Sequence, residues 1–135
     1  MATSCAAVGS ASALPALLTK RTALAQVAFC VGCCCGRTER GFPPVPVERL
    51  KQVWKAEKLN KTVQLTISGC LGPCDLANVM LVMTAEGMQW FGGIADDALF
   101  EAVVDWARAC HAAAALLPLP AVLEQHRFQR FAELA

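Results

Sequence analysis

The chain has 135 residues, a net charge of +1, 56% hydrophobic residues and 17% charged residues. This length suits one domain with short additions, and the near-neutral charge gives no sign of a nucleic-acid or anionic-membrane partner. No apolar run approaches the roughly 20 residues that a membrane-spanning helix needs. The unusual count is that of cysteine, because six of the eight cysteines fall into two short clusters.

The first 24 residues are rich in alanine and serine and contain no acidic residue. Transit peptides and plain flexible tails share this composition, and we predict a flexible tail over residues 1–24. Residues 26–29 are a short apolar run that ends at Cys30 and predicts a buried strand. A loop should follow over residues 31–46, because three glycines and three prolines interrupt any regular pattern there.

Residues 47–59 have the apolar spacing of a helix, and alternation at positions 63, 65 and 67 predicts a half-buried strand that leads into Cys70. Residues 79–83 and 88–91 read as a hairpin with a turn at Glu86–Gly87. Asp96 can cap a second helix, and residues 119–132 predict a further short amphipathic helix. The apolar faces of the two longer helices are Val47, Leu50, Val53 and Trp54, and then Leu99, Val103, Trp106 and Cys110.

The expected order is strand, helix, strand, long loop, strand, strand and helix. A strand–helix–strand start implies a right-handed parallel crossover, and the last two strands form a hairpin. This order predicts an α/β fold of the thioredoxin-like type, with a mixed sheet of about four strands and flanking helices. The domain should cover residues 25–113, and a helical extension should cover residues 114–135.

The two cysteine clusters follow two predicted strand ends, so they can meet at one end of the sheet. Four residues separate Cys30 from Cys35, three separate Cys70 from Cys74, and 34 lie between the pairs. A [2Fe–2S] cluster needs four thiolates, two on each iron, and two loops that carry one pair each can supply them. Neighbouring cysteines form disulfides poorly with one another, and clustered thiols in a reducing cytoplasm favour metal or redox chemistry.

The stretches CVGCCCG and CLGPCDLANVM resemble the thioredoxin-like [2Fe–2S] ferredoxins over residues 25–110, and they are similar to the small iron–sulfur subunit of NADH:quinone oxidoreductase. The resemblance implies one [2Fe–2S] cluster and an electron-transfer protein rather than an enzyme. It also implies redox partner proteins, and it admits a homodimer, since relatives of this type are often homodimers. The implied ligands are Cys30, Cys35, Cys70 and Cys74. A looser resemblance, to ferredoxin-like proteins of cobalamin biosynthesis, rests on CCCGRTERGFPPVP and CLGPCDLANV.

The family pattern does not need Cys33 and Cys34, and these two residues keep other interpretations open. Cys30-x2-Cys33 together with Cys70-x3-Cys74 also satisfies a structural zinc site. Cys30 and Cys33 also form a C-x-x-C motif after a strand, as in thiol–disulfide oxidoreductases. Against this last interpretation, further cysteines and prolines follow the motif, where a helix would be needed to depress the pKa of the attacking thiol.

Overall fold

The computed structural model of the chain describes residues 16–134. The predicted flexible tail, and the transit peptide that it could be instead, fall mainly on residues 1–15, which lie outside the described residues. Residues 16–24 belong to no helix or strand, and the first strand begins at Ala25.

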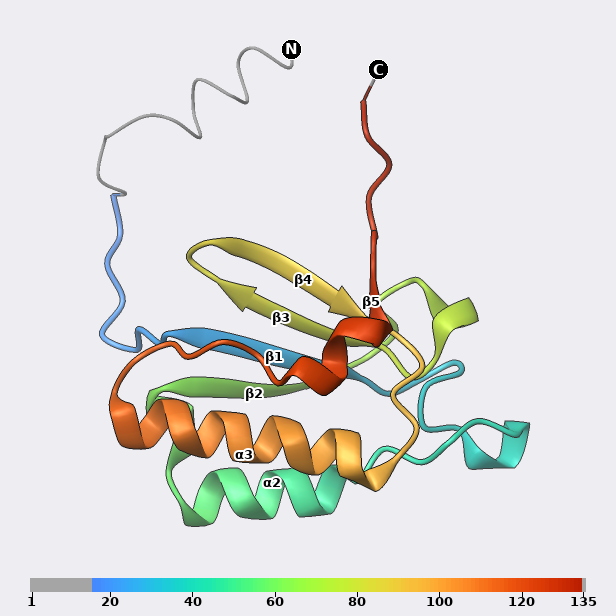
Figure 1. The fold of residues 1–135 in the computed structure, drawn as a ribbon, viewed down its shortest axis with the longest axis horizontal. Coiled ribbons are helices and arrows are strands. Elements are labelled where there is room, and N and C mark those ends of the chain that lie inside the picture. Colours follow the sequence, from blue (N-terminus) through green and yellow to red (C-terminus); the bar gives the residue numbers. More distant parts are fainter. Residues whose placement is uncertain (1–15, 135) are drawn as a thin grey trace.

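The described residues form a mixed α/β fold with one five-stranded sheet (Figure 1). The strands are β1 (Ala25–Cys30), β2 (Val63–Ser68), β3 (Met80–Thr84), β4 (Gly87–Phe91) and β5 (Arg127–Phe128). The α-helices are α2 (Val47–Ala56) and α3 (Asp97–Ala113), and the 3-10 helices are η1 (Thr38–Arg40), η2 (Leu59–Lys61), η3 (Cys74–Leu76) and η4 (Ala121–His126). The strand order is β2-β1-β3-β4-β5, with β1 parallel to β2 and the other neighbours antiparallel. The predicted parallel pair and the predicted hairpin are therefore confirmed.

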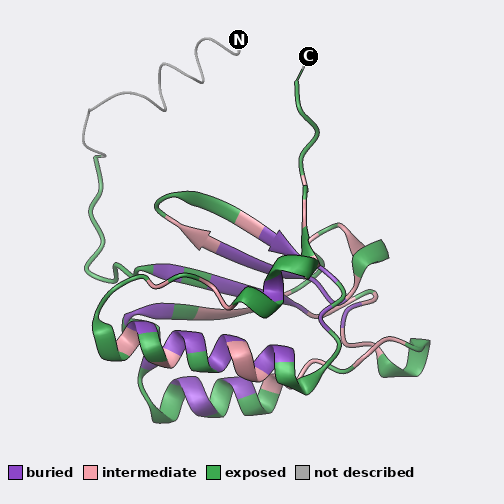
Figure 2. Cartoon of the chain, in the orientation of Figure 1, coloured by how far each residue is buried: buried purple, intermediate pink, exposed green. Residues whose placement is uncertain are grey.

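Strand β1 lies inside the sheet and contributes to a core on each face. Val27 and Phe29 belong to the main core, which α2 and α3 cover from the same side of the sheet (Figure 1). The buried positions of the two helices, purple in Figure 2, follow the predicted apolar faces except at Val47, which is only partly buried; this is the pattern of amphipathic helices on a sheet. Ala28 and Cys30 belong instead to a smaller core on the opposite face. No α-helix covers that face in the part of the chain that the structure describes.

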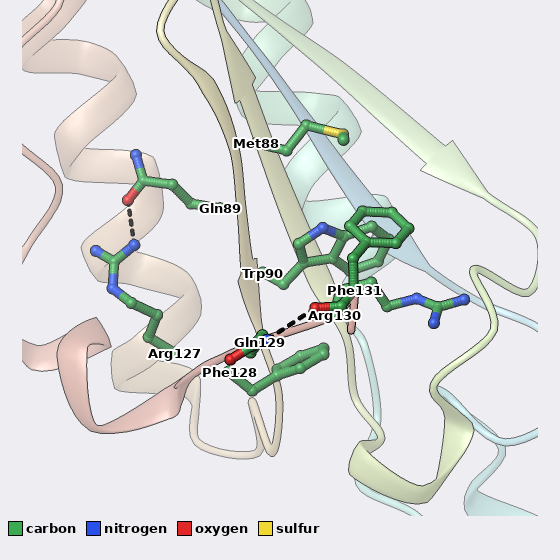
Figure 3. Close-up of a pocket in the computed structure, with 8 residues that line it drawn as sticks. All are labelled: Met88, Gln89, Trp90, Arg127, Phe128, Gln129, Arg130 and Phe131. Carbon is green, nitrogen blue, oxygen red and sulfur yellow. Dashed lines mark hydrogen bonds between the residues drawn. The ribbon is translucent and has the colours of Figure 1, made fainter. Parts of the chain in front are cut away.

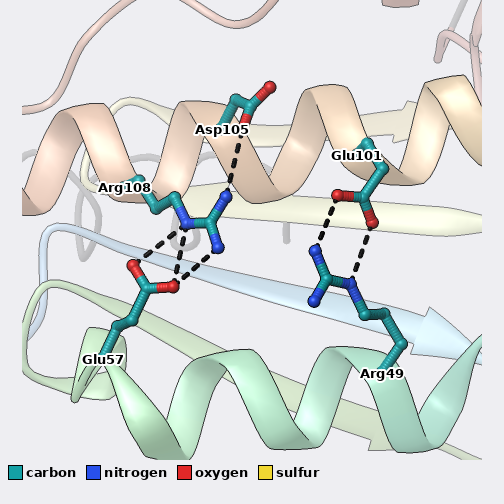
Figure 4. Close-up of polar contacts among 5 residues, drawn as sticks. All are labelled: Arg49, Glu57, Glu101, Asp105 and Arg108. Carbon is teal, nitrogen blue, oxygen red and sulfur yellow. Dashed lines mark hydrogen bonds and ion pairs between the residues drawn. The ribbon is translucent and has the colours of Figure 1, made fainter.

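Ion pairs on the surface link α3 to α2 and to the residue that follows α2 (Figure 4). Arg49 pairs with Glu101 at 2.9 Å, and Arg108 pairs with Glu57 at 2.6 Å and with Asp105 at 3.4 Å. These side chains are about half exposed, so each pair contributes at most about 1 kcal/mol. The packing of the apolar faces, not the ion pairs, holds the helices on the sheet.

Two expectations about the sheet and the C-terminal residues are wrong. The sheet has five strands rather than about four, and the predicted helix over residues 119–132 is the 3-10 helix η4 followed by β5. Only Leu123 of η4 is buried, so a longer helix would gain little from packing. The extended chain instead pairs with the edge of β4 and lays the Phe128 ring 6.1 Å from the Trp90 ring, which covers an otherwise open strand edge.

Candidate functional site

The two cysteine loops leave the sheet side by side. We call residues 31–37 the first cysteine loop and residues 69–77 the second cysteine loop. Cys30, the last residue of β1, is in register with Ser68, the last residue of the parallel strand β2. The Val31 N–H donates to the Ser68 carbonyl at 3.0 Å, and the Cys30 N–H donates to the Val79 carbonyl at 3.0 Å. The parallel pairing therefore brings both loops to one end of the sheet.

Gly32 allows the backbones of the two loops to touch. A Cβ added at Gly32 would lie 3.3 Å from the backbone nitrogen of Cys70 and 3.9 Å from its Cα. A larger residue would push the loops apart, because its neighbours there are backbone atoms that cannot rotate away. The close approach of the two main chains thus explains why position 32 is a glycine.

The four cysteines predicted as ligands form an inner pair and an outer pair. Cys30 and Cys35 are buried in the smaller core, and the Cys35 sulfur accepts a hydrogen bond from the Val79 N–H at 3.3 Å. Cys70 and Cys74 lie nearer the surface, with their sulfur atoms 3.7 Å apart. All four thiols are free. Within residues 16–134, no group of three or more His, Cys, Asp or Glu side chains surrounds one point as a single metal ion would require.

The pKa of one thiol in each pair is raised by its surroundings. Burial, followed by the neighbouring Cys30 thiol, raises the pKa of Cys35 from 9.0 to about 12, and the charge of Cys74 acts in the same direction. Contact with Cys70, followed by burial, raises the pKa of Cys74. In each pair, burial and the neighbouring thiol therefore favour the protonated form.

Cys33, which is not one of the four predicted ligands, has a different environment from them. The Arg40 guanidinium lies 3.6 Å from the Cys33 sulfur and donates a hydrogen bond to the Cys33 carbonyl at 2.6 Å. The hydrogen bond from Arg40, then that with Cys34, lowers the pKa of Cys33. Cys33 is exposed, whereas Cys30 is buried beside Cys35. The C-x-x-C pair therefore has one thiol in the core and the other on the surface.

Asn78 is a positioning residue that the sequence analysis did not identify. Its side-chain oxygen accepts a hydrogen bond from the Gly36 N–H at 2.8 Å, and its side-chain nitrogen donates to the carbonyls of Pro43 and Ile94 at 3.1 and 3.0 Å. The residue is 2% exposed. It thus ties the end of the first cysteine loop to Pro43, in the loop before α2, and to Ile94, in the segment after β4. One asparagine in a loop gives no signal in the sequence for such a role.

Comparisons with known proteins provide no relative for this site. The chain matches no family model, no curated protein and no solved structure. Among residues 16–134, no helix is both long enough and apolar enough to cross a membrane.

Proposed function

We propose that the chain is a small electron carrier of the thioredoxin-like [2Fe–2S] ferredoxin type, which holds one cluster with Cys30, Cys35, Cys70 and Cys74. One observation carries the proposal: two loops from adjacent parallel strands bring two pairs of free thiols to the same end of the sheet. A [2Fe–2S] cluster takes its four thiolates as two pairs, one on each iron. The order of β1 to β4, with β1 parallel to β2 and a hairpin beside β1, also supports a thioredoxin-like fold.

The residues present fit such a group in their donor chemistry. The donors are four thiols that form no disulfide, and the two histidines contact residues outside the two cysteine loops. The Nδ1 atom of His111 lies 2.8 Å from the Thr62 hydroxyl, and that of His126 lies 2.9 Å from the Gly92 carbonyl. All-thiolate ligation is proposed because the four thiols lie on the two segments that leave one end of the sheet.

The two pairs of proposed ligands differ in how far they are buried. Cys30 and Cys35 would bind one side of the cluster within the smaller core, where the apolar side chains of Val79 and Leu81 exclude water. Cys70 and Cys74 would hold the other side near the surface, where a redox partner protein can approach. A bound cluster would supply reversible one-electron chemistry. The chain itself excludes water on one side and leaves a path for electrons on the other.

Loading must remove the proton from Cys35, because only the thiolate is a ligand. The raised pKa of this thiol makes the apoprotein resist losing that proton, so loading should become more favourable as the pH rises. A reducing cytoplasm is the compartment in which four such thiols stay free of disulfides.

Single serine substitutions in the anaerobically expressed protein test the ligand set. We expect four of them to weaken or abolish the visible spectrum of the cluster, and these are Cys30→Ser, Cys35→Ser, Cys70→Ser and Cys74→Ser. Cys33→Ser and Cys34→Ser are matched controls from the same loop, and they should keep the spectrum. Cluster stoichiometry must be measured beside the spectrum, because a neighbouring thiol can replace a lost ligand. Loss of the cluster in Cys33→Ser with retention in Cys35→Ser would overturn the ligand assignment.

A structural zinc site is the second candidate, and it uses Cys33 in place of Cys35. Zinc needs its four ligands around a single ion, whereas the thiols of this chain lie in two pairs and Cys33 faces Arg40. A colourless protein with one zinc per chain and no acid-labile sulfide would favour this alternative. The same serine variants separate the two, because zinc retention would then depend on Cys33.

A further inference from the structure

Arg130, in the C-terminal segment after β5, occupies a space beside the second cysteine loop. A Cβ added at Gly72 would lie 2.6 Å from the Nη2 atom of Arg130 and 3.5 Å from its Cζ atom. The guanidinium thus fills the place where any other residue at position 72 would carry a side chain. Gly72 also has a φ of +115°, which L-residues rarely adopt.

Gly72 connects this contact to a predicted ligand. The Gly72 carbonyl accepts hydrogen bonds from the Cys74 N–H at 2.9 Å and from the Cys74 thiol at 3.3 Å. Arg130 therefore lies against Gly72, the residue whose carbonyl bonds to the main chain and the thiol of Cys74. A substitution at position 130 can therefore alter the position of Cys74 through Gly72.

Aromatic rings hold the Arg130 guanidinium in place (Figure 3). It lies over the rings of Trp90 and Phe131, with its Cζ atom 5.5 Å from each ring centroid. The Trp90 and Phe131 rings meet edge to face at 6.0 Å. Trp90 belongs to the same small core as Cys30 and Cys35. Arg130 thus contacts Trp90, which belongs to the core around the inner pair, and also lies against the second cysteine loop, which carries the outer pair.

The charge of Arg130 has no counter-ion in residues 16–134. No carboxylate pairs with it, and its Nε atom is buried without a hydrogen-bond partner. Arg127, three residues earlier, is different, because it pairs with Glu124 at 2.7 Å and also bonds to Gln89. A half-buried guanidinium without a counter-ion acts over a longer distance than a solvated one, because the surrounding medium screens it less.

From these contacts we infer that Arg130 is a positioning residue for the second cysteine loop and that its charge raises the reduction potential of the cluster held there. The inference rests on the proposed function. Four thiolates give a [2Fe–2S] site a net negative charge, and reduction adds one more. A fixed cation beside the loop stabilises the reduced form more than the oxidised form. The guanidinium also restrains Gly72, which keeps Cys74 in the geometry for ligation.

The test compares the full-length protein with Arg130→Gln, Arg130→Lys and Arg127→Gln. Arg127→Gln is the matched control, since it removes the same charge from the same segment without touching Gly72. We expect Arg130→Gln to have a more negative midpoint potential in a redox titration. It should also lose its cluster to a chelator roughly 10-fold faster, because removal of a residue that supports a ligand typically lowers metal affinity by a factor of about 10 to 100. Arg130→Lys should restore most of the potential, and Arg127→Gln should match the unsubstituted protein in both measurements.

Each other outcome decides the inference. Equal potentials and equal rates of cluster loss in Arg130→Gln and Arg127→Gln would overturn it. So would an Arg130→Lys potential as negative as that of Arg130→Gln, because the charge would then have no effect. An Arg130→Gln chain that is folded by circular dichroism but takes up no cluster, beside a fully loaded Arg127→Gln chain, supports the positioning role. An unsubstituted chain that takes up no iron or sulfide refutes the proposed function itself, and it is recognised before the variants are compared.

Discussion

Replacing Asn78 with alanine should destabilise the cluster-free protein by about 3 kcal/mol. The substitution leaves the Ile94 carbonyl, which is buried, without its side-chain donor, and it does the same to the Gly36 N–H and the Pro43 carbonyl, which are partly buried. A buried polar group without its partner costs about 1–3 kcal/mol, and a partly buried one costs less because water can reach it. With a urea m-value of about 1.5 kcal/mol/M, the midpoint of unfolding should fall by roughly 2 M.

Asn60→Ala is the matched control for this experiment. Asn60 also accepts a backbone hydrogen bond, from the Leu65 N–H at 2.8 Å, but the bond is exposed. Its loss should cost about 1 kcal/mol or less. Urea unfolding followed by far-ultraviolet circular dichroism measures both variants. Equal midpoints for Asn78→Ala and Asn60→Ala would refute the claim that Asn78 fastens the first cysteine loop to its surroundings.

Further predictions concern the potential, the pH dependence and the surface ion pairs. A cluster with four thiolate ligands should have a midpoint potential on the order of −400 mV, and a redox titration that places it above zero would point to a histidine ligand. Because the pKa of Cys35 rises from 9.0 to about 12 on folding, the folded apoprotein binds this proton more tightly than the unfolded chain. Below pH 9 the proton is bound in both states and its contribution to the free energy of unfolding is fully present. That contribution is lost as the pH rises from 9 towards 12, and urea titrations of Cys35→Ala should show a smaller decline over this range. Arg108→Ala should lower the free energy of unfolding by no more than about 1 kcal/mol, since its partners Glu57 and Asp105 are exposed; a larger loss at low salt would contradict that view of the helix surface.

The sequence was most informative where periodicity decides the structure. The apolar spacing of Leu50, Val53 and Trp54 predicted the buried face of α2, and the structure confirms it. The alternation at Val63, Leu65 and Ile67 predicted β2 in the same way. The prediction that the two cysteine clusters leave the same end of the sheet came from the same patterns, because Cys30 ends β1 and Cys70 comes two residues after the end of β2.

Contacts between residues far apart in the chain could not be predicted in this way. Asn78 bonds to Gly36, which lies 42 residues earlier, and Arg130 packs on Gly72 from a segment that was expected to be helical. Strand β5 has only two residues, which is too short for alternation to be recognised. Each of these features is decided by tertiary pairing, which local propensity does not encode.

The content of iron and acid-labile sulfide in the anaerobically purified protein tests the central claim most directly. We expect two irons and two sulfides per chain, a brown colour, and an electron paramagnetic resonance signal that appears only after reduction. A folded, colourless protein that contains stoichiometric zinc and no sulfide would contradict the account.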